Sequence, residues 1–143
     1  MRIDAAPRAA LLVAVAAAAL AAMPAGAGRA AAPGFALRIA APERLAPGAP
    51  ATIDVFVRLP PGPEQPLLLT PSSEGEALRV VRGRLLRTDA RRTPDGELHF
   101  QVPVETRGEG TAVLRVHLLT YRCAGRCEAV QLDQSLALQV RAR

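Results

Sequence analysis

Apolar and polar residues alternate with a period of two along most of the chain after residue 34. The alternation is clearest in five segments, at residues 35–39, 53–59, 98–104, 114–118 and 130–140. A period of two puts apolar side chains on one face of a β-strand, so each segment predicts a strand with a buried and a solvent-facing side. Shorter strands are predicted at 66–70 and 77–82.

Turn-forming residues separate these segments. Proline and glycine cluster at 46–48, 60–63, 93–96 and 108–110, where they favour tight turns. About seven strands joined by such turns, with no helical period between them, predict an all-β fold, an antiparallel immunoglobulin-like β-sandwich. Pro103 lies inside a predicted strand, and a proline fits there only where its missing N–H would have faced an edge.

The N-terminus has the pattern of a secretory signal peptide. Arg2 and Arg8 precede an unbroken run of Ala, Leu and Val at 9–22, which has the length of a signal-peptide hydrophobic region and is short for a membrane span. Pro24 is then expected to break the helix of this segment, and the small residues that end at Ala27 supply a cleavage site. An uncleaved membrane anchor is the alternative interpretation.

We therefore predict three parts: a signal peptide at 1–27, a flexible leader at 28–34 and one immunoglobulin-like domain at 35–143. The mature length suits a single domain with one modest core. Export would make the mature chain periplasmic or secreted, and not membrane-inserted. It would also place the two cysteines in an oxidising compartment, where a disulfide persists.

Composition narrows the classes of function. The formal net charge is +5, but all eighteen basic residues are arginines scattered among acids, and the chain has only one Tyr and three Phe for base stacking. This pattern predicts a weakly basic surface and no nucleic-acid partner. The sequence contains neither a glycine-rich phosphate loop nor a Gly-x-Ser-x-Gly motif. Ser72 and Ser73 are expected in a polar turn, which is where such serines commonly lie.

Four residues have side chains of the type that binds zinc or copper: His99, His117, Cys123 and Cys127. Both histidines take outward positions in predicted strands, where exposed histidines are common. Paired cysteines of exported proteins usually oxidise, and the only two methionines fall within the predicted signal peptide. We predict neither a metal site nor a cofactor.

The two cysteines lie in the segment YRCAGRC, residues 121–127. A predicted strand precedes the segment and another follows it, so Cys123 and Cys127 should face each other across a tight hairpin. Opposed positions in such a hairpin have Cα atoms about 4.5–5.5 Å apart, within the range that a disulfide needs. Closing so short a ring removes little denatured-state entropy, about 2 kcal/mol against about 3 for a fifteen-residue loop. The small gain favours a redox pair over a structural bond but leaves both open.

The neighbouring residues also favour redox chemistry. Arg122 and Arg126 place positive charge beside the sulfurs and should favour the thiolate, the form that attacks a disulfide, although Glu128 opposes them in part. By the alternation, Tyr121 shares the outward, partly apolar face of Cys123. A loop or a partner should cover this face, unless the strand runs beneath another part of the sandwich. We expect Cys123 to be the attacking cysteine, because that face offers a docking surface.

The segment 96–140 resembles the N-terminal periplasmic domain of the thiol:disulfide interchange protein DsbD. The matching stretches are GELHFQVPVE, GTAVLRVHLLTYRC and CEAVQLDQSLALQV, and LLLTPSSEGEALRV is similar to the strand and turn before the family's cap loop. The resemblance implies an immunoglobulin-like fold in which Cys123 and Cys127 accept electrons from a membrane thioredoxin-type relay and pass them to periplasmic oxidoreductases. It makes Tyr121 the tyrosine before the pair and roughly 84–96 the cap loop, here without an aromatic residue.

Two hypotheses for function follow. The first is a periplasmic thiol–disulfide exchange module whose pair, Cys123 and Cys127, passes electrons to or from a thioredoxin-fold periplasmic or membrane oxidoreductase, with Tyr121, Arg122 and Arg126 in support. The second is a non-catalytic secreted immunoglobulin-like binding or accessory domain, in which the disulfide is structural and inert.

Overall fold

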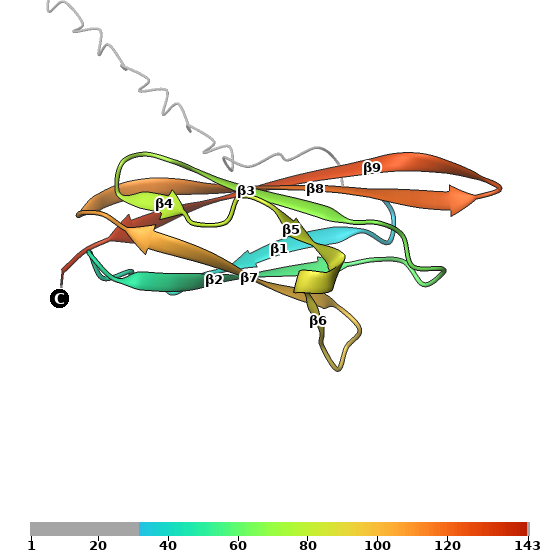
Figure 1. Cartoon of the computed structure of the whole chain (residues 1–143), viewed down its shortest axis with the longest axis horizontal. Coiled ribbons are helices and arrows are strands. Elements are labelled where there is room, and N and C mark those ends of the chain that lie inside the picture. Colours follow the sequence, from blue (N-terminus) through green and yellow to red (C-terminus); the bar gives the residue numbers. More distant parts are fainter. Residues whose placement is uncertain (1–31, 143) are drawn as a thin grey trace, which may run out of the picture.

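The computed structural model describes residues 32–142, which form two β-sheets packed face to face (Figure 1). The predicted signal peptide and most of the predicted leader lie outside the described residues. Within 32–142, no helix is long and apolar enough to cross a membrane. The helical content of this part is a single 3₁₀ turn, η1 (Arg87–Asp89).

Each sheet has a simple antiparallel order. The first sheet runs in the order β1 (Ala36–Ala40), β2 (Pro50–Arg58), β7 (Leu98–Thr106) and β4 (Leu78–Val80), and β6 (Arg91–Arg92) also pairs with β7. The second sheet runs in the order β5 (Leu85–Leu86), β3 (Leu68–Glu74), β8 (Gly110–Ala124) and β9 (Arg126–Val140). A parallel bridge from Leu45 to Val140 ties the segment after β1 to the second sheet.

The strand order is that of an immunoglobulin constant-type domain. Setting aside the two-residue strands β5 and β6, the orders β1-β2-β7-β4 and β3-β8-β9 correspond to strands ABED and CFG of that fold. The predicted all-β, antiparallel immunoglobulin-like sandwich of about seven strands is therefore confirmed. Such a fold hosts many functions, so the function has to be argued from the site.

The alternation in the sequence becomes the two-sided burial of the strands. In β2, Ile53, Val55 and Val57 are fully buried, while Asp54 and Phe56 between them are half-buried on the outer face. Strands β7 and β8 contribute inward side chains in the same way: Phe100, Val102, Val104, Leu114, Val116 and Leu118. These side chains fill the space between the two sheets as one continuous core.

One local prediction is wrong. The sequence predicts Ser72 and Ser73 in a polar turn, but both lie in β3, which pairs with β8 from Leu68 to Glu74. The ladder to β8 outweighs the turn propensity of the two serines, because pairing satisfies the backbone of the whole segment. The Ser73 hydroxyl also donates to the carbonyl oxygen of Leu78 at 3.0 Å, which links β3 to β4.

Pro103 lies opposite a gap in the first sheet. On one side β7 pairs with β2. On the other side, β6 pairs with β7 only as far as His99 and β4 pairs with it only from Val104 onward, so residues 100–103 have no strand partner there. The Pro103 carbonyl accepts a hydrogen bond from the N–H of Val81 at 3.0 Å, which shows that its backbone faces this gap. The missing N–H therefore faces a local edge, as the sequence requires.

Candidate functional site

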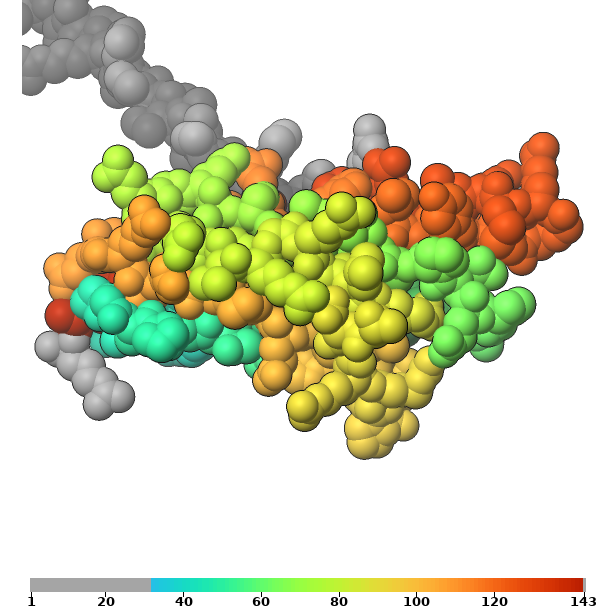
Figure 2. All heavy atoms as spheres, in the orientation of Figure 1, coloured from blue at the N-terminus to red at the C-terminus, as the bar shows by residue number. Residues whose placement is uncertain are grey.

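The cysteines lie at the tip of a long hairpin that extends past the rest of the second sheet. Strands β8 and β9 have 15 residues each, whereas the ladder from β3 reaches only to Leu119 of β8. Figure 1 shows the hairpin end projecting beyond the other strands, and Figure 2 shows it as a separate orange-red lobe. The tip is therefore free on the side where β3 would otherwise continue.

The predicted pairing of the cysteines is confirmed. Cys123 lies directly opposite Cys127 in the β8–β9 ladder, and their Sγ atoms are at bonding distance. Their Cα atoms are 4.0 Å apart, closer than the expected separation. Gly125 forms the end of the turn with φ +78°, a left-handed conformation that glycine adopts without strain. Cys127 is exposed and Cys123 is half-buried, so a partner reaches the sulfur of Cys127 more easily. This exposure favours Cys127 as the cysteine that bonds to a partner, in contrast to the expectation from the sequence that Cys123 attacks.

Both flanking arginines form ion pairs with one carboxylate. Arg122 Nη2 lies 3.3 Å from Glu128 Oε2, and Arg126 Nε lies 3.5 Å from Glu128 Oε1. Arg122 and Glu128 are opposed residues in the ladder. All three side chains are about half-exposed or more, so the pairs are screened by solvent. The predicted positive charge beside the disulfide is present, but Glu128 offsets part of it.

The outer face beside the disulfide is apolar. Leu86, Leu68 and Leu119 form one cross-strand row over β5, β3 and β8. The next outward side chain of β8 is Tyr121, which lies opposite Ala129 and is 38% exposed. Leu86 is 48% exposed. Among residues 32–142, this face is left largely open to solvent, in contrast to the covering loop that the sequence suggested.

A groove of about 520 Å³ opens beneath the hairpin. It lies between three segments that are far apart in the sequence: the proline-rich loop 60–65, residues around Arg87 and Arg92, and residues 120–123 of β8. In Figure 2 the green proline-rich loop lies below the hairpin lobe. The groove was not predicted, because the sequence indicates the loop only as a turn.

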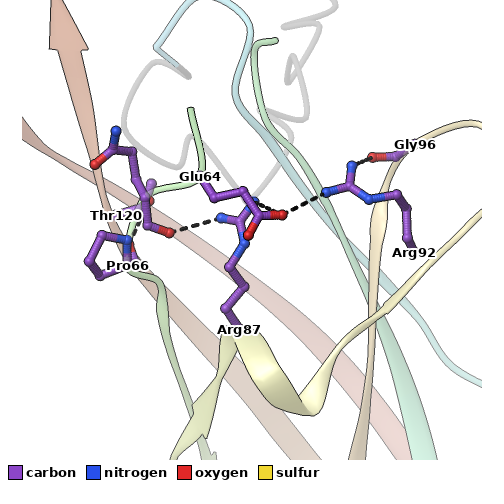
Figure 3. A network of polar contacts seen from close by, with 7 residues as sticks. Glu64, Pro66, Arg87, Arg92, Gly96 and Thr120 are labelled. Atoms are coloured by element: carbon purple, nitrogen blue, oxygen red, sulfur yellow. Dashed lines mark hydrogen bonds and ion pairs between the residues drawn. The ribbon is translucent and has the colours of Figure 1, made fainter. Parts of the chain in front are cut away.

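A polar network fixes the walls of the groove (Figure 3). Glu64 Oε1 lies 3.8 Å from Arg87 Nη2 and 3.5 Å from Arg92 Nη2. The Arg87 guanidinium also donates to the carbonyl oxygen of Gln65 at 2.9 Å. The buried Thr120 hydroxyl donates to the carbonyl oxygen of Pro66 at 3.0 Å, and so joins the loop to the start of the projecting hairpin.

The segment that the resemblance assigns as a cap, residues 84–96, forms β5, η1, β6 and the turn after it. Arg87, Arg92 and Gly96 of this segment line the groove. Asp89 holds the 3₁₀ turn, because its carboxylate accepts the Leu86 N–H at 2.7 Å. This hydrogen bond lowers the pKa of Asp89 below its usual value, and the nearby Arg82 guanidinium lowers it further.

The four residues with metal-binding side chains do not come together. His99 lies on the outer face of β7 and His117 on the outer face of β8, in different sheets. His99 Nε2 is 2.7 Å from Asp54 Oδ1, and His117 Nδ1 is 2.6 Å from Asp133 Oδ1. In the described part of the chain, no group of three or more His, Cys, Asp or Glu side chains could hold a metal ion.

Comparison of the chain with protein-family models, with curated proteins and with solved structures finds no significant match. The fold and the cysteine hairpin are therefore the basis for any statement about function.

Proposed function

We propose that the protein is a periplasmic thiol–disulfide exchange module that uses Cys123 and Cys127 as its redox pair. One observation carries the proposal: the disulfide joins directly opposed residues at the exposed tip of a projecting hairpin. Hydrogen bonds along β8 and β9 already hold the two strands together, and the bond closes a ring of only five residues. Its contribution to the free energy of unfolding is therefore limited to about 2 kcal/mol.

The exchange proceeds through a mixed disulfide. The thiolate of a thioredoxin-fold oxidoreductase attacks the exposed sulfur of Cys127, the Cys123–Cys127 bond breaks, and Cys123 leaves as a thiolate. The partner's second cysteine, as a thiolate, then attacks the sulfur of the partner's first cysteine in the mixed disulfide, and Cys127 leaves as a thiolate. The module gains two electrons and becomes a dithiol, and the partner is oxidised to a disulfide. The reverse sequence passes the electrons onward.

The surroundings of the tip support this chemistry. Arg122 and Arg126 favour the leaving thiolate, and Tyr121 with the apolar row at Leu119 offers a surface on which a partner can dock. The sequence resemblance to the N-terminal domain of DsbD supports the same role. The partner in this proposal is a thioredoxin-fold oxidoreductase, either in the periplasm or in a membrane that faces it.

The accessory-domain hypothesis is favoured by a different observation. Glu128 pairs with both flanking arginines, which reduces the positive charge that would activate a thiol. In that case the disulfide would be an inert link across a turn.

Two measurements separate these functions. The first is the reduction potential of the pair, measured against glutathione. Inert structural disulfides have potentials below about −300 mV, and we expect the potential of this pair to lie well above that value. The second uses reduced thioredoxin whose resolving cysteine is replaced by serine. This thioredoxin variant should form a mixed disulfide at Cys127, identified by peptide mass. The Cys123→Ser, Cys127→Ser double variant is the negative control. A low potential with no mixed disulfide would reject the redox function.

A further inference from the structure

Strand β9 is the one long edge strand within residues 32–142. It is last in the order β5-β3-β8-β9 and has 15 residues, whereas the other strands at the sheet margins, β1, β4, β5 and β6, have five or fewer. Proteins usually protect exposed edges with short strands, prolines, lysines or bulges. β9 contains neither proline nor lysine, and it pairs one-to-one with β8 along its whole length, without a bulge.

The backbone of this edge is available for pairing. Leu45 bonds to the outer side of β9 near its end, since its N–H donates to the Gln139 carbonyl at 3.1 Å and its carbonyl accepts the Arg141 N–H at 3.0 Å. Successive residues of a strand direct their backbone groups to opposite sides, so odd-numbered residues face outward throughout the strand. From 127 to 137, these groups have no backbone partner among the described residues.

The inward-facing apolar residues of β9 between positions 130 and 138 are symmetric about Gln134. They stand two and four positions away on both sides of it and are Val130, Leu132, Leu136 and Leu138. A two-fold symmetric interface needs a surface that is complementary to itself. We propose that two copies of this chain join through their β9 edges as an antiparallel pair, with the two-fold axis at Gln134.

This register is compatible with the charges and with Leu45. Leu132 of one copy faces Leu136 of the other, and Asp133 faces Ser135 of the second copy. A shift of the axis to Asp133 would oppose two carboxylates, which is destabilising. Leu136 is only half-buried in the single chain, and the second strand would cover it. Leu45 limits the new ladder to residues 131–137.

A cysteine at the symmetry axis tests the register directly. Gln134 is exposed, and at the axis it would form a non-hydrogen-bonded pair with its own copy, with Cα atoms about 4.5 Å apart, within disulfide range. Gln134→Cys should therefore give a covalent dimer on non-reducing electrophoresis, with a 134–134 linkage identified by peptide mass. Gln139→Cys is the matched control, because Leu45 occupies that position on the edge. Equal cross-linking of the two variants would overturn the proposal.

A second measurement does not depend on an added cysteine. Sedimentation equilibrium of the unaltered protein should give twice the chain mass. Ser135→Pro removes an outward-facing N–H without touching the β8–β9 ladder, and it should return the mass to that of one chain while the β-sheet circular dichroism is kept. Ser135→Ala should stay dimeric. A monomer mass for the unaltered protein at every concentration would refute the pairing. Neither result depends on the redox function.

Discussion

The hydroxyl of Thr120 donates to the carbonyl oxygen of Pro66 at 3.0 Å, and this bond ties the projecting cysteine hairpin to the proline-rich loop. Thr120 is 1% exposed, so water does not reach its hydroxyl without local rearrangement. Thr120 lines the groove beneath the disulfide, and Pro66 directly follows the loop 60–65 that forms another wall of it. This contact therefore helps to set the position of the groove relative to the cysteines, together with the ion pairs of Glu64.

Replacement of Thr120 by valine should destabilise the fold by about 0.5–1.5 kcal/mol. Valine has the same shape but has no hydroxyl to donate to the Pro66 carbonyl, and the net contribution of one such hydrogen bond to the free energy of unfolding is about this much. Urea unfolding followed by circular dichroism gives the free energy. Thr120→Ser keeps the hydroxyl and should lose less, and Thr70→Val changes an exposed threonine of β3 and should stay within about 0.5 kcal/mol of the natural protein. A Thr120→Val variant as stable as the natural protein would contradict the role of this bond.

The Cys123→Ser, Cys127→Ser double variant should lose at most about 2 kcal/mol of unfolding free energy, because only a five-residue ring is opened. Reduction of the natural protein with dithiothreitol should lower its stability by a similar amount. Both are measured by urea unfolding with and without the reductant. A double variant that does not fold would show that the disulfide is structural, and it would favour the accessory-domain hypothesis.

The Asp89→Asn substitution should destabilise the protein only above acidic pH. The Leu86 N–H and Arg82 lower the folded-state pKa of Asp89, so the ionised carboxylate stabilises the folded state. This contribution is complete above the unfolded-state pKa of about 3.9 and is lost as the pH falls through the lower folded-state pKa. Urea unfolding curves, recorded from neutral pH down to the lowest pH at which the protein is still folded, measure this contribution.

The natural protein and Asp89→Asn should therefore converge in stability in acid. Asp95→Asn removes the same charge from the exposed turn after β6 and is the control. A constant difference between the natural protein and Asp89→Asn at all pH values would show that the substitution acts through packing rather than through ionisation.

The sequence predicts the strands of the core because their apolar residues follow the period of a strand buried on one side. The predicted strand at 53–59 corresponds to β2 (Pro50–Arg58) and the one at 98–104 to β7 (Leu98–Thr106), and Ile53, Val55, Val57, Phe100, Val102 and Val104 face inward as expected. The turn at Gly125 and the pairing of Cys123 with Cys127 are also predictable, since they depend on residues close in the sequence.

Features that depend on distant residues were not predicted. The groove forms because Glu64, Arg87 and Thr120 meet in space, and no local pattern indicates that they do. Likewise, the local residue types around Ser72 favour a turn, and only the ladder to β8 makes the segment a strand. The extension of β8 and β9 past their neighbour is a property of the sheet and not of either strand alone.

Replacement of Glu128 by glutamine should speed the reduction of the disulfide. The Glu128 carboxylate lies 3.3 Å from the Arg122 guanidinium and 3.5 Å from that of Arg126. Glutamine removes the negative charge and leaves both positive charges unopposed beside the sulfurs. The increased positive potential attracts an anionic thiolate and stabilises the thiolate that leaves. Because these side chains are exposed, we expect a modest effect, about two-fold in rate with glutathione at low salt.

The measurement is the second-order rate constant for reduction by glutathione, at low ionic strength and in about 1 M salt, where the Debye length falls to about 3 Å. The acceleration should shrink in high salt. Glu105→Gln is the matched control, because it makes the same change of charge in an ion pair with Arg79 on the first sheet. Equal rates for Glu128→Gln and Glu105→Gln at low salt would mean that Glu128 does not restrain the pair. The partial neutralisation of the two arginines would then give no support to the accessory-domain hypothesis.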